Sequence, residues 1–155
     1  MRPTNLDSRT LSNIQKLIES NFKGRDELYA AAESVDSESR ERICQRLAEH
    51  LAANAIELQQ IVTASGVQPA GPLDTEAIAY ELFDLVKLNR GEAGVLDAAA
   101  KSERSLKKDY DVAIDRTADR EAEALLRKQR ADVEFGEQVL RNIEKPLTEG
   151  ERNIE

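Results

Sequence analysis

The sequence predicts an all-α protein. Apolar residues recur every three to four positions over long stretches, which is the period of an amphipathic helix. Helix-forming residues dominate, proline is confined to positions 3, 69, 72 and 146, and no run of alternating β-branched residues predicts a strand. The 155 residues, of which 40% are hydrophobic, are expected to form a single bundle over residues 6–145, followed by a polar tail over residues 146–155.

The first helix is expected over residues 6–35 and the second from a turn at residues 34–39 to about Ala64. Asp36 or Ser37 is the expected N-cap of the second helix, and Gly66 follows its end, where a left-handed cap is common. Each helix carries an apolar stripe, made of Leu11, Ile14, Ile18, Phe22, Tyr29 and Ala32 in the first and Ile43, Leu47, Leu51, Asn54, Leu58 and Ile61 in the second.

Residues 66–73 (GVQPAGPL) are rich in proline and glycine and predict a long crossover within one bundle. Asp74 is expected to cap a short extra helix that ends near Leu88. The apolar stripe of this helix is expected to be Ile78, Leu82, Leu85 and Val86. Tyr80, Phe83 and Leu88 are the candidates for a surface that covers the bundle or forms a dimer.

The chain is expected to bend at residues 89–94 and to continue as a third long helix over residues 92–116. Thr117 is the expected cap of a fourth helix, which Pro146 is expected to end. The inward positions are Val95, Ala99, Leu106, Tyr110 and Ala113 in the third helix and Ala122, Leu126, Val133, Gly136 and Leu140 in the fourth. Two helices, a long connection and two more helices are typical of a four-helix bundle with one crossover.

Charge and composition exclude several functions. The net charge of −8 argues against nucleic acid and against an anionic membrane surface as partners. No apolar stretch is long enough to span a bilayer and Met1–Thr10 has no signal-peptide core, so a cytoplasmic protein is expected. Cys44 is the single cysteine and His50 the single histidine, so neither an internal disulfide nor a histidine-rich metal site is expected.

A few polar residues fall within or beside the apolar stripes near the middle of the bundle. They are Arg25, His50, Asn54, Glu103 and Gln129. Buried polar groups need partners, so these residues are expected to form a polar layer. In that layer Arg25 pairs with Glu103, and Asn54 and Gln129 complete the hydrogen bonds. Alternatively, the head of Arg25 reaches water along a groove.

The other interpretation of these residues is a metal site. Di-iron bundle proteins use a glutamate from each of two helices and Glu-x-x-His from each of the other two. The residue three places before His50 is Leu47, so Glu-x-x-His is absent from the chain. No metal or other cofactor is therefore expected. The open alternative is a single ion held by Glu103 with Glu33, Glu49 or Glu137.

Four stretches of the chain resemble an uncharacterised bacterial family of ferritin-like four-helix-bundle proteins, over about Leu11 to Glu144. They are LIESNFKGRDELYAAAESV, IELQQIVTASGVQP, AAAKSERSLKKDYDVAI and VLRNIE. The resemblance implies a ferritin-like fold, a cytoplasmic setting and no assigned reaction. Ferritin-like oxidases carry Glu-x6-Tyr on their first and third helices; the third helix keeps this pattern as Glu103 and Tyr110, whereas Phe22 occupies the first-helix position.

These observations lead to two main hypotheses about function, beside a third possibility, a carrier of a small apolar ligand, which would need a sizeable cavity between the helices. The first is a non-enzymatic helical-bundle protein with a degenerate metal site, which forms a dimer or binds another protein and acts in a stress-related context. The alternative is a metal-binding ferritin-like carboxylate protein, either an iron oxidase or a carrier. No catalytic residue is assigned under the first hypothesis.

Overall fold

The computed structural model describes the backbone of residues 6–154 and the side chains of residues 6–148. In this range the chain forms four helices and no strand: α1 (Ser8–Ser34), α2 (Glu38–Ala64), α3 (Glu76–Asp115) and α4 (Arg120–Ile154). The prediction of an all-α four-helix protein is confirmed. None of the helices within these residues has an apolar stretch that would cross a bilayer.

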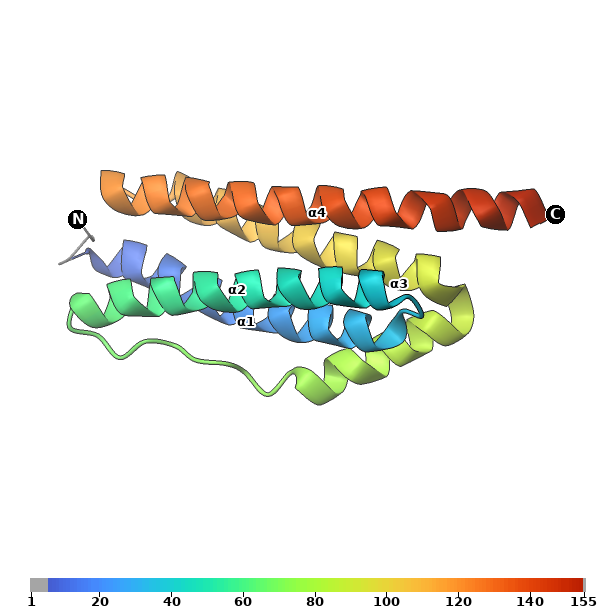
Figure 1. Cartoon of the computed structure of the whole chain (residues 1–155). Helices are drawn as coiled ribbons and strands as arrows, with labels where there is room; N and C mark the ends of the chain where they lie inside the picture. The colour runs from blue at the N-terminus through green and yellow to red at the C-terminus, as the bar shows by residue number, and fades with distance from the viewer. Residues whose placement is uncertain (1–5, 155) are drawn as a thin grey trace.

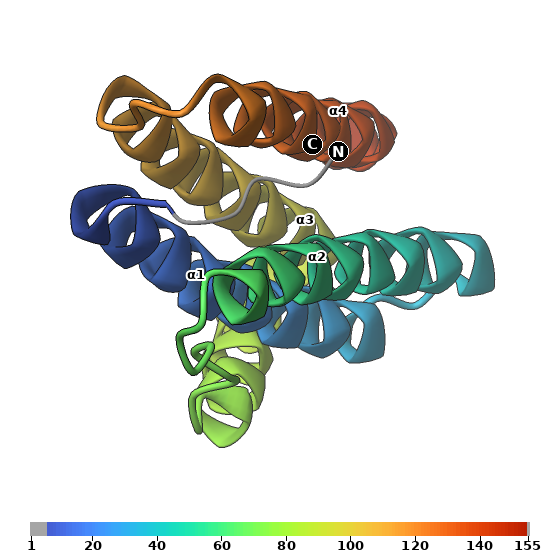
Figure 2. The same cartoon turned by 90° about the vertical axis from the view of Figure 1, so that its left-hand side faces the viewer.

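The four helices are arranged as two antiparallel pairs (Figure 1). α1 packs closely on α2, α3 packs on α4, and the contact between α1 and α3 joins the two pairs. By contrast, α2 and α4 make few contacts with each other. Figure 2, which looks along the bundle, shows α4 and the N-terminal part of α3 on opposite sides of the molecule.

Polar caps start three of the helices. The side chains of Asp7, Ser37 and Asp119 accept hydrogen bonds from backbone N–H groups in the first turns of α1, α2 and α4. The expected cap at Ser37 is confirmed. For α4 the expected cap was Thr117, but the capping residue is Asp119, whose ionised carboxylate also suits the positive end of the helix dipole.

Gly66 confirms the predicted end of α2. Its φ is 79°, and the backbone N–H of Val67 donates to the carbonyl of Val62 at 3.3 Å, which is the bonding pattern of a left-handed helix cap. Glycine adopts this conformation without steric cost.

Between Ala64 and Glu76 the chain runs as a long connection along α1 and α2 (Figure 1). Two glutamines hold it there. The Gln15 side chain donates to the carbonyl of Gln68 and accepts from the N–H of Ala70, and the Gln59 side chain donates to the carbonyl of Ala70. These bonds satisfy backbone groups that have no partner within a strand or helix.

The predicted short helix and third helix form one element, α3, which is interrupted at Gly91. This residue has φ 68° and ψ −168°, a conformation outside the helical region that is open essentially only to glycine. The expected cap at Asp74 is wrong: Thr75 precedes the helix, and its hydroxyl donates to Asp26 of α1 at 2.8 Å.

Ion pairs hold the chain on both sides of Gly91. Asp97 accepts hydrogen bonds from Arg90 and Arg141 and also pairs with Lys101. Its burial alone raises the pKa of the carboxyl, but these three cations outweigh burial and hold the pKa of Asp97 well below its usual range. Glu92 in turn forms a two-pronged pair with Arg40 of α2.

The apolar stripes predicted for the four long helices face the core. The stripe predicted for the short helix, which is the N-terminal part of α3, does not face the core. Ala79 and Phe83 face the core, and Phe83 is only 1% exposed. Ile78, Leu82 and Leu85, which were expected on the inner stripe, are exposed, as is Leu88. The expectation that Phe83 is a surface candidate is therefore wrong; Tyr80 is half-buried.

α4 continues past Pro146 to Ile154, so the prediction that Pro146 ends the helix is wrong. Proline removes one helical hydrogen bond, and Pro146 is exposed to solvent, where water can satisfy the freed carbonyl. This end of α4 extends beyond the other helices (Figure 1). The predicted polar tail of residues 146–155 is thus helical as far as Ile154, and the side chains of residues 149–155 lie outside the described part.

We predict that Gly91→Ala destabilises the protein by about 1–3 kcal/mol, because an L-residue is strained at this φ and ψ. The measurement is the free energy of urea unfolding. Gly71→Ala is the matched control, since a Cβ there would meet no atom within 4 Å and its φ is not positive. Equal stability of the two variants would contradict the strain argument.

Candidate functional site

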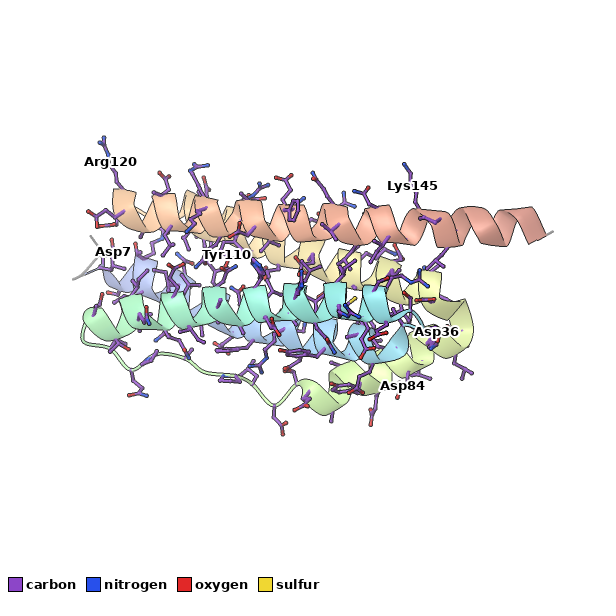
Figure 3. The ribbon with its side chains drawn as sticks, in the orientation of Figure 1. Asp7, Asp36, Asp84, Tyr110, Arg120 and Lys145 are labelled. Carbon is purple, nitrogen blue, oxygen red and sulfur yellow. The ribbon has the colours of Figure 1, made fainter. Side chains whose placement is uncertain are left out.

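A chain of hydrogen bonds crosses the interior and joins all four helices. The Asn21 side chain of α1 donates to the Tyr110 hydroxyl of α3 at 2.9 Å, and this hydroxyl donates to Oε1 of Gln129 of α4 at 2.8 Å. Tyr110, Asn21 and Gln129 are all buried. In Figure 3, Tyr110 is labelled in the space between α4 and the pair formed by α1 and α2.

Gln129 completes the chain by binding α2. Its Nε2 donates to the carboxylate of Glu57 at 2.9 Å and to the backbone carbonyl of Asn54 at 3.3 Å. The Asn21 side chain also donates to the carbonyl of Leu17 in its own helix. We call Asn21, Tyr110, Gln129 and Glu57 the polar chain. Burial raises the pKa of the Tyr110 phenol, so the hydroxyl stays protonated and keeps its role as a donor.

Glu103 lies apart from the polar chain. Its side chain is 2% exposed and has neither a hydrogen bond nor an ion pair with any described residue. Burial, with smaller contributions from the nearby carboxylates of Glu137 and Glu27, raises its pKa to about 8. The carboxyl group is therefore largely neutral at pH 7.

Gly136 of α4 makes room for this carboxyl group. A Cβ added at Gly136 would lie 2.7 Å from Oε2 of Glu103, which is closer than real Cβ contacts come. The glycine that sequence analysis placed in the apolar stripe of the fourth helix thus gives space to a carboxyl group.

A groove of about 280 Å³ lies between α2 and α4, and Glu103 forms part of its lining. The walls are apolar and come from both helices; they are Ile43, Leu47 and Leu51 on α2, and Val133, Phe135 and Val139 on α4. Arg46, His50 and Asp132 also line the groove and are exposed. The groove exists because α2 and α4 are the least closely packed neighbours in the bundle.

The expected pair between Arg25 and Glu103 does not form. Arg25 binds Asp26 at 2.9 Å, and its guanidinium lies over the Phe22 ring with 4.8 Å to the ring centre. Arg25 is half-buried, and its guanidinium lies near the surface, where Asp26 neutralises the charge. Asn54, Glu103 and Gln129 are buried, whereas His50 is exposed and lies at the groove.

The glutamates that were candidates to hold a metal ion with Glu103 are either exposed or already paired. Glu33 and Glu49 are exposed, and Glu137 pairs with Lys107 at 2.8 Å. Within the described residues, no group of three or more His, Cys, Asp or Glu side chains is placed to hold a metal ion. Cys44 is buried in the core, and burial together with Glu92 raises the pKa of its thiol to about 12, so it is an unreactive packing residue.

Sequence analysis missed two members of the polar chain and the role of a third. Asn21 lies four residues after buried Leu17 and seven before buried Leu28, so its position on the buried face was detectable. Tyr110 was predicted only as an inward position of the third helix, although a buried tyrosine hydroxyl usually has a partner. Nothing in the sequence indicated Glu57, which lies beside the apolar stripe of its helix.

Comparisons with known proteins found no family model, no curated protein and no solved structure that matches the chain.

We predict that Tyr110→Phe lowers stability by about 1–3 kcal/mol, because it leaves the buried Asn21 and Gln129 side chains without a shared partner. Urea unfolding measures the change. Tyr29→Phe is the control, since the half-buried Tyr29 makes no hydrogen bond through its hydroxyl with any described residue. A loss of the same size in both variants would show that the polar chain contributes nothing specific.

We also predict that Glu103 makes stability depend on pH. The folded state holds the Glu103 proton up to about pH 8, whereas an unfolded glutamic acid releases it near about pH 4.3. The contribution of Glu103 to stability is therefore fully present at low pH and is lost as the pH rises through 8. We compare the unfolding free energy of Glu103→Gln with that of the natural protein. The difference, variant minus natural protein, should increase by about 2 kcal/mol or more between pH 5 and pH 8.

Denaturant unfolding at several pH values provides this measurement. Glu49→Gln, at an exposed position on α2, is the control for the loss of one acidic group. An equally pH-dependent difference in the control would contradict the assignment to Glu103.

Proposed function

We propose that this protein is a non-enzymatic helical-bundle module that forms a homodimer through the N-terminal part of α3. The observation that supports the proposal is a set of four large apolar side chains, Ile78, Leu82, Leu85 and Leu88, whose exposed fractions range from 48% to 81%. We call these four residues the α3 stripe.

The spacing of the α3 stripe places its members on one side of the helix. Intervals of four and three residues bring Ile78, Leu82 and Leu85 close together on the surface, with Leu88 at the edge. The opposite side of the same segment packs Ala79 and Phe83 into the core. This part of α3 is therefore apolar on two sides, although the bundle covers only one of them.

A second copy of the chain is the occupant that best fits the α3 stripe. The segment projects from the bundle on the side away from α4 (Figure 2), so the stripe is open to another molecule. Large contiguous apolar patches are uncommon on monomeric proteins. A two-fold axis through the stripe would cover it in both molecules with one self-complementary contact, as in most homodimers.

The ferritin-like relationship, the bacterial origin and the cytoplasmic setting belong to the same proposal, as does a stress-related role. The order of the helices supports the relationship: two antiparallel helices, a long connection and a second antiparallel pair (Figure 1). The residue resemblance over about Leu11 to Glu144 supports it as well.

We predict that the natural protein is a dimer and that Leu82→Glu with Leu85→Glu weakens dimerisation at least about tenfold, because burying the new charges at an apolar contact is unfavourable. Sedimentation velocity over a range of concentrations measures the association. Val112→Glu, at an exposed apolar position elsewhere on α3, is the control and should leave the dimer intact. A natural protein that is monomeric at every concentration would contradict the proposal.

A further inference from the structure

The groove between α2 and α4 contains a buried acid that the bundle does not use. Glu103 is 2% exposed, lines the groove and has no hydrogen bond or ion pair with the described residues. A buried carboxyl group without a partner destabilises a protein. Such a group is explained most simply if its partner is a ligand.

The surroundings of Glu103 define the chemistry of that ligand. Aliphatic and aromatic side chains from α2 and α4 form the walls, so the body of the ligand should be apolar. A carboxylate at the base of an apolar groove attracts one positive charge. We therefore propose that the groove binds a small apolar molecule that carries a protonated amine, with Glu103 as its counter-ion.

Asn54 is a second buried polar residue in the lining of the same groove. Its side chain is 8% exposed, lines the groove and has an Nδ2 without a hydrogen-bond partner among the described residues. Its backbone carbonyl is already bound by Gln129. This nitrogen is itself shielded from solvent, so it adds no exposed donor to the groove.

The charges around Glu103 favour a cation over an anion. The charges of Glu27 of α1 and Glu137 of α4 help to raise the pKa of Glu103, and Asp132 of α4 lies at the groove. α2 contributes Arg46 and His50 to the groove lining, and both are exposed to solvent. On its own helix, Lys107 is paired with Glu137. No described cation pairs with Glu103, so its carboxyl group is available to a ligand.

Binding should release a proton. The neutral acid of Glu103 gives up H⁺ to solvent and becomes a carboxylate, while the ligand keeps its own ammonium proton, so charge and atoms balance. With the pKa of Glu103 near 8, this release should be nearly complete at pH 6 and disappear above pH 9, and affinity should rise over the same interval.

The size and composition of the groove distinguish an amine from other occupants. A volume of about 280 Å³ is at the lower end of small-molecule sites, which span roughly 300–1,000 Å³, and is small for a partner helix. A divalent metal ion needs several oxygen or nitrogen ligands, and the described residues contain no group of three such side chains placed to hold one.

The experiment compares two probes of equal shape, hexylamine and 1-hexanol, by isothermal titration calorimetry at pH 7. We expect hexylammonium to bind at least about tenfold more tightly than hexanol, because only the amine forms a charged pair with Glu103. Repeating the titration in buffers of different ionisation enthalpy measures the released proton. Amide shifts in NMR spectra should be confined to residues of the groove.

Two variants locate the effect. Glu103→Gln should abolish the preference for the amine and the proton release while hexanol binding is unchanged, which also shows that the groove is intact. Glu49→Gln, which removes an exposed carboxylate of α2 that does not line the groove, is the matched control and should change amine affinity by less than about threefold.

Several results would overturn the proposal. They are equal affinity for the two probes, no binding of either probe, or a larger loss in Glu49→Gln than in Glu103→Gln. Stoichiometric binding of ferrous or manganous ions that Glu103→Gln abolishes would instead assign Glu103 to a metal site. Because the α3 stripe belongs to a different surface, dimerisation and amine binding can fail independently.

Discussion

The interior of this bundle depends on satisfying one buried set of polar groups. Asn21, Tyr110, Gln129 and Glu57 come from four different helices, and each hydrogen bond requires the next helix to have the correct height and rotation. Apolar packing alone tolerates small sliding movements, because many apolar arrangements have similar energies. Directional bonds between buried groups do not, since a misplaced helix leaves a donor or acceptor unpaired. The polar chain therefore defines the register of the bundle.

The polar chain also limits how far α2 and α4 can separate. These helices make few direct contacts, and the bonds from Gln129 to Glu57 and to the Asn54 carbonyl join them at one level. The groove lies beside this connection and includes Asn54 in its lining. Glu103 lines the groove and forms no hydrogen bond with the polar chain, so its carboxyl group is unpaired among the described residues.

Local sequence signals predicted most of the fold. The apolar stripes of the long helices, the cap at Ser37 and the left-handed Gly66 depend on neighbouring residues and were predicted correctly. The wrong predictions concern positions where the local sequence is compatible with two structures. The N-terminal part of α3 is apolar on two sides, and only tertiary packing selects Phe83 over Leu82 for the core. Pro146 lies inside a helix because its exposed surroundings tolerate the lost bond.

The sequence by itself determined an acidic, all-helical bundle with one long connection, and it identified Asn54, Glu103 and Gln129 as buried polar residues. Helical periodicity is a local property, so the positions that face inward follow from the order of residues. The partners of those residues depend on the heights and rotations of helices that are distant in the chain. Only the tertiary structure could therefore separate Arg25 from Glu103, connect Gln129 to Tyr110, and place Glu103 in a groove between α2 and α4.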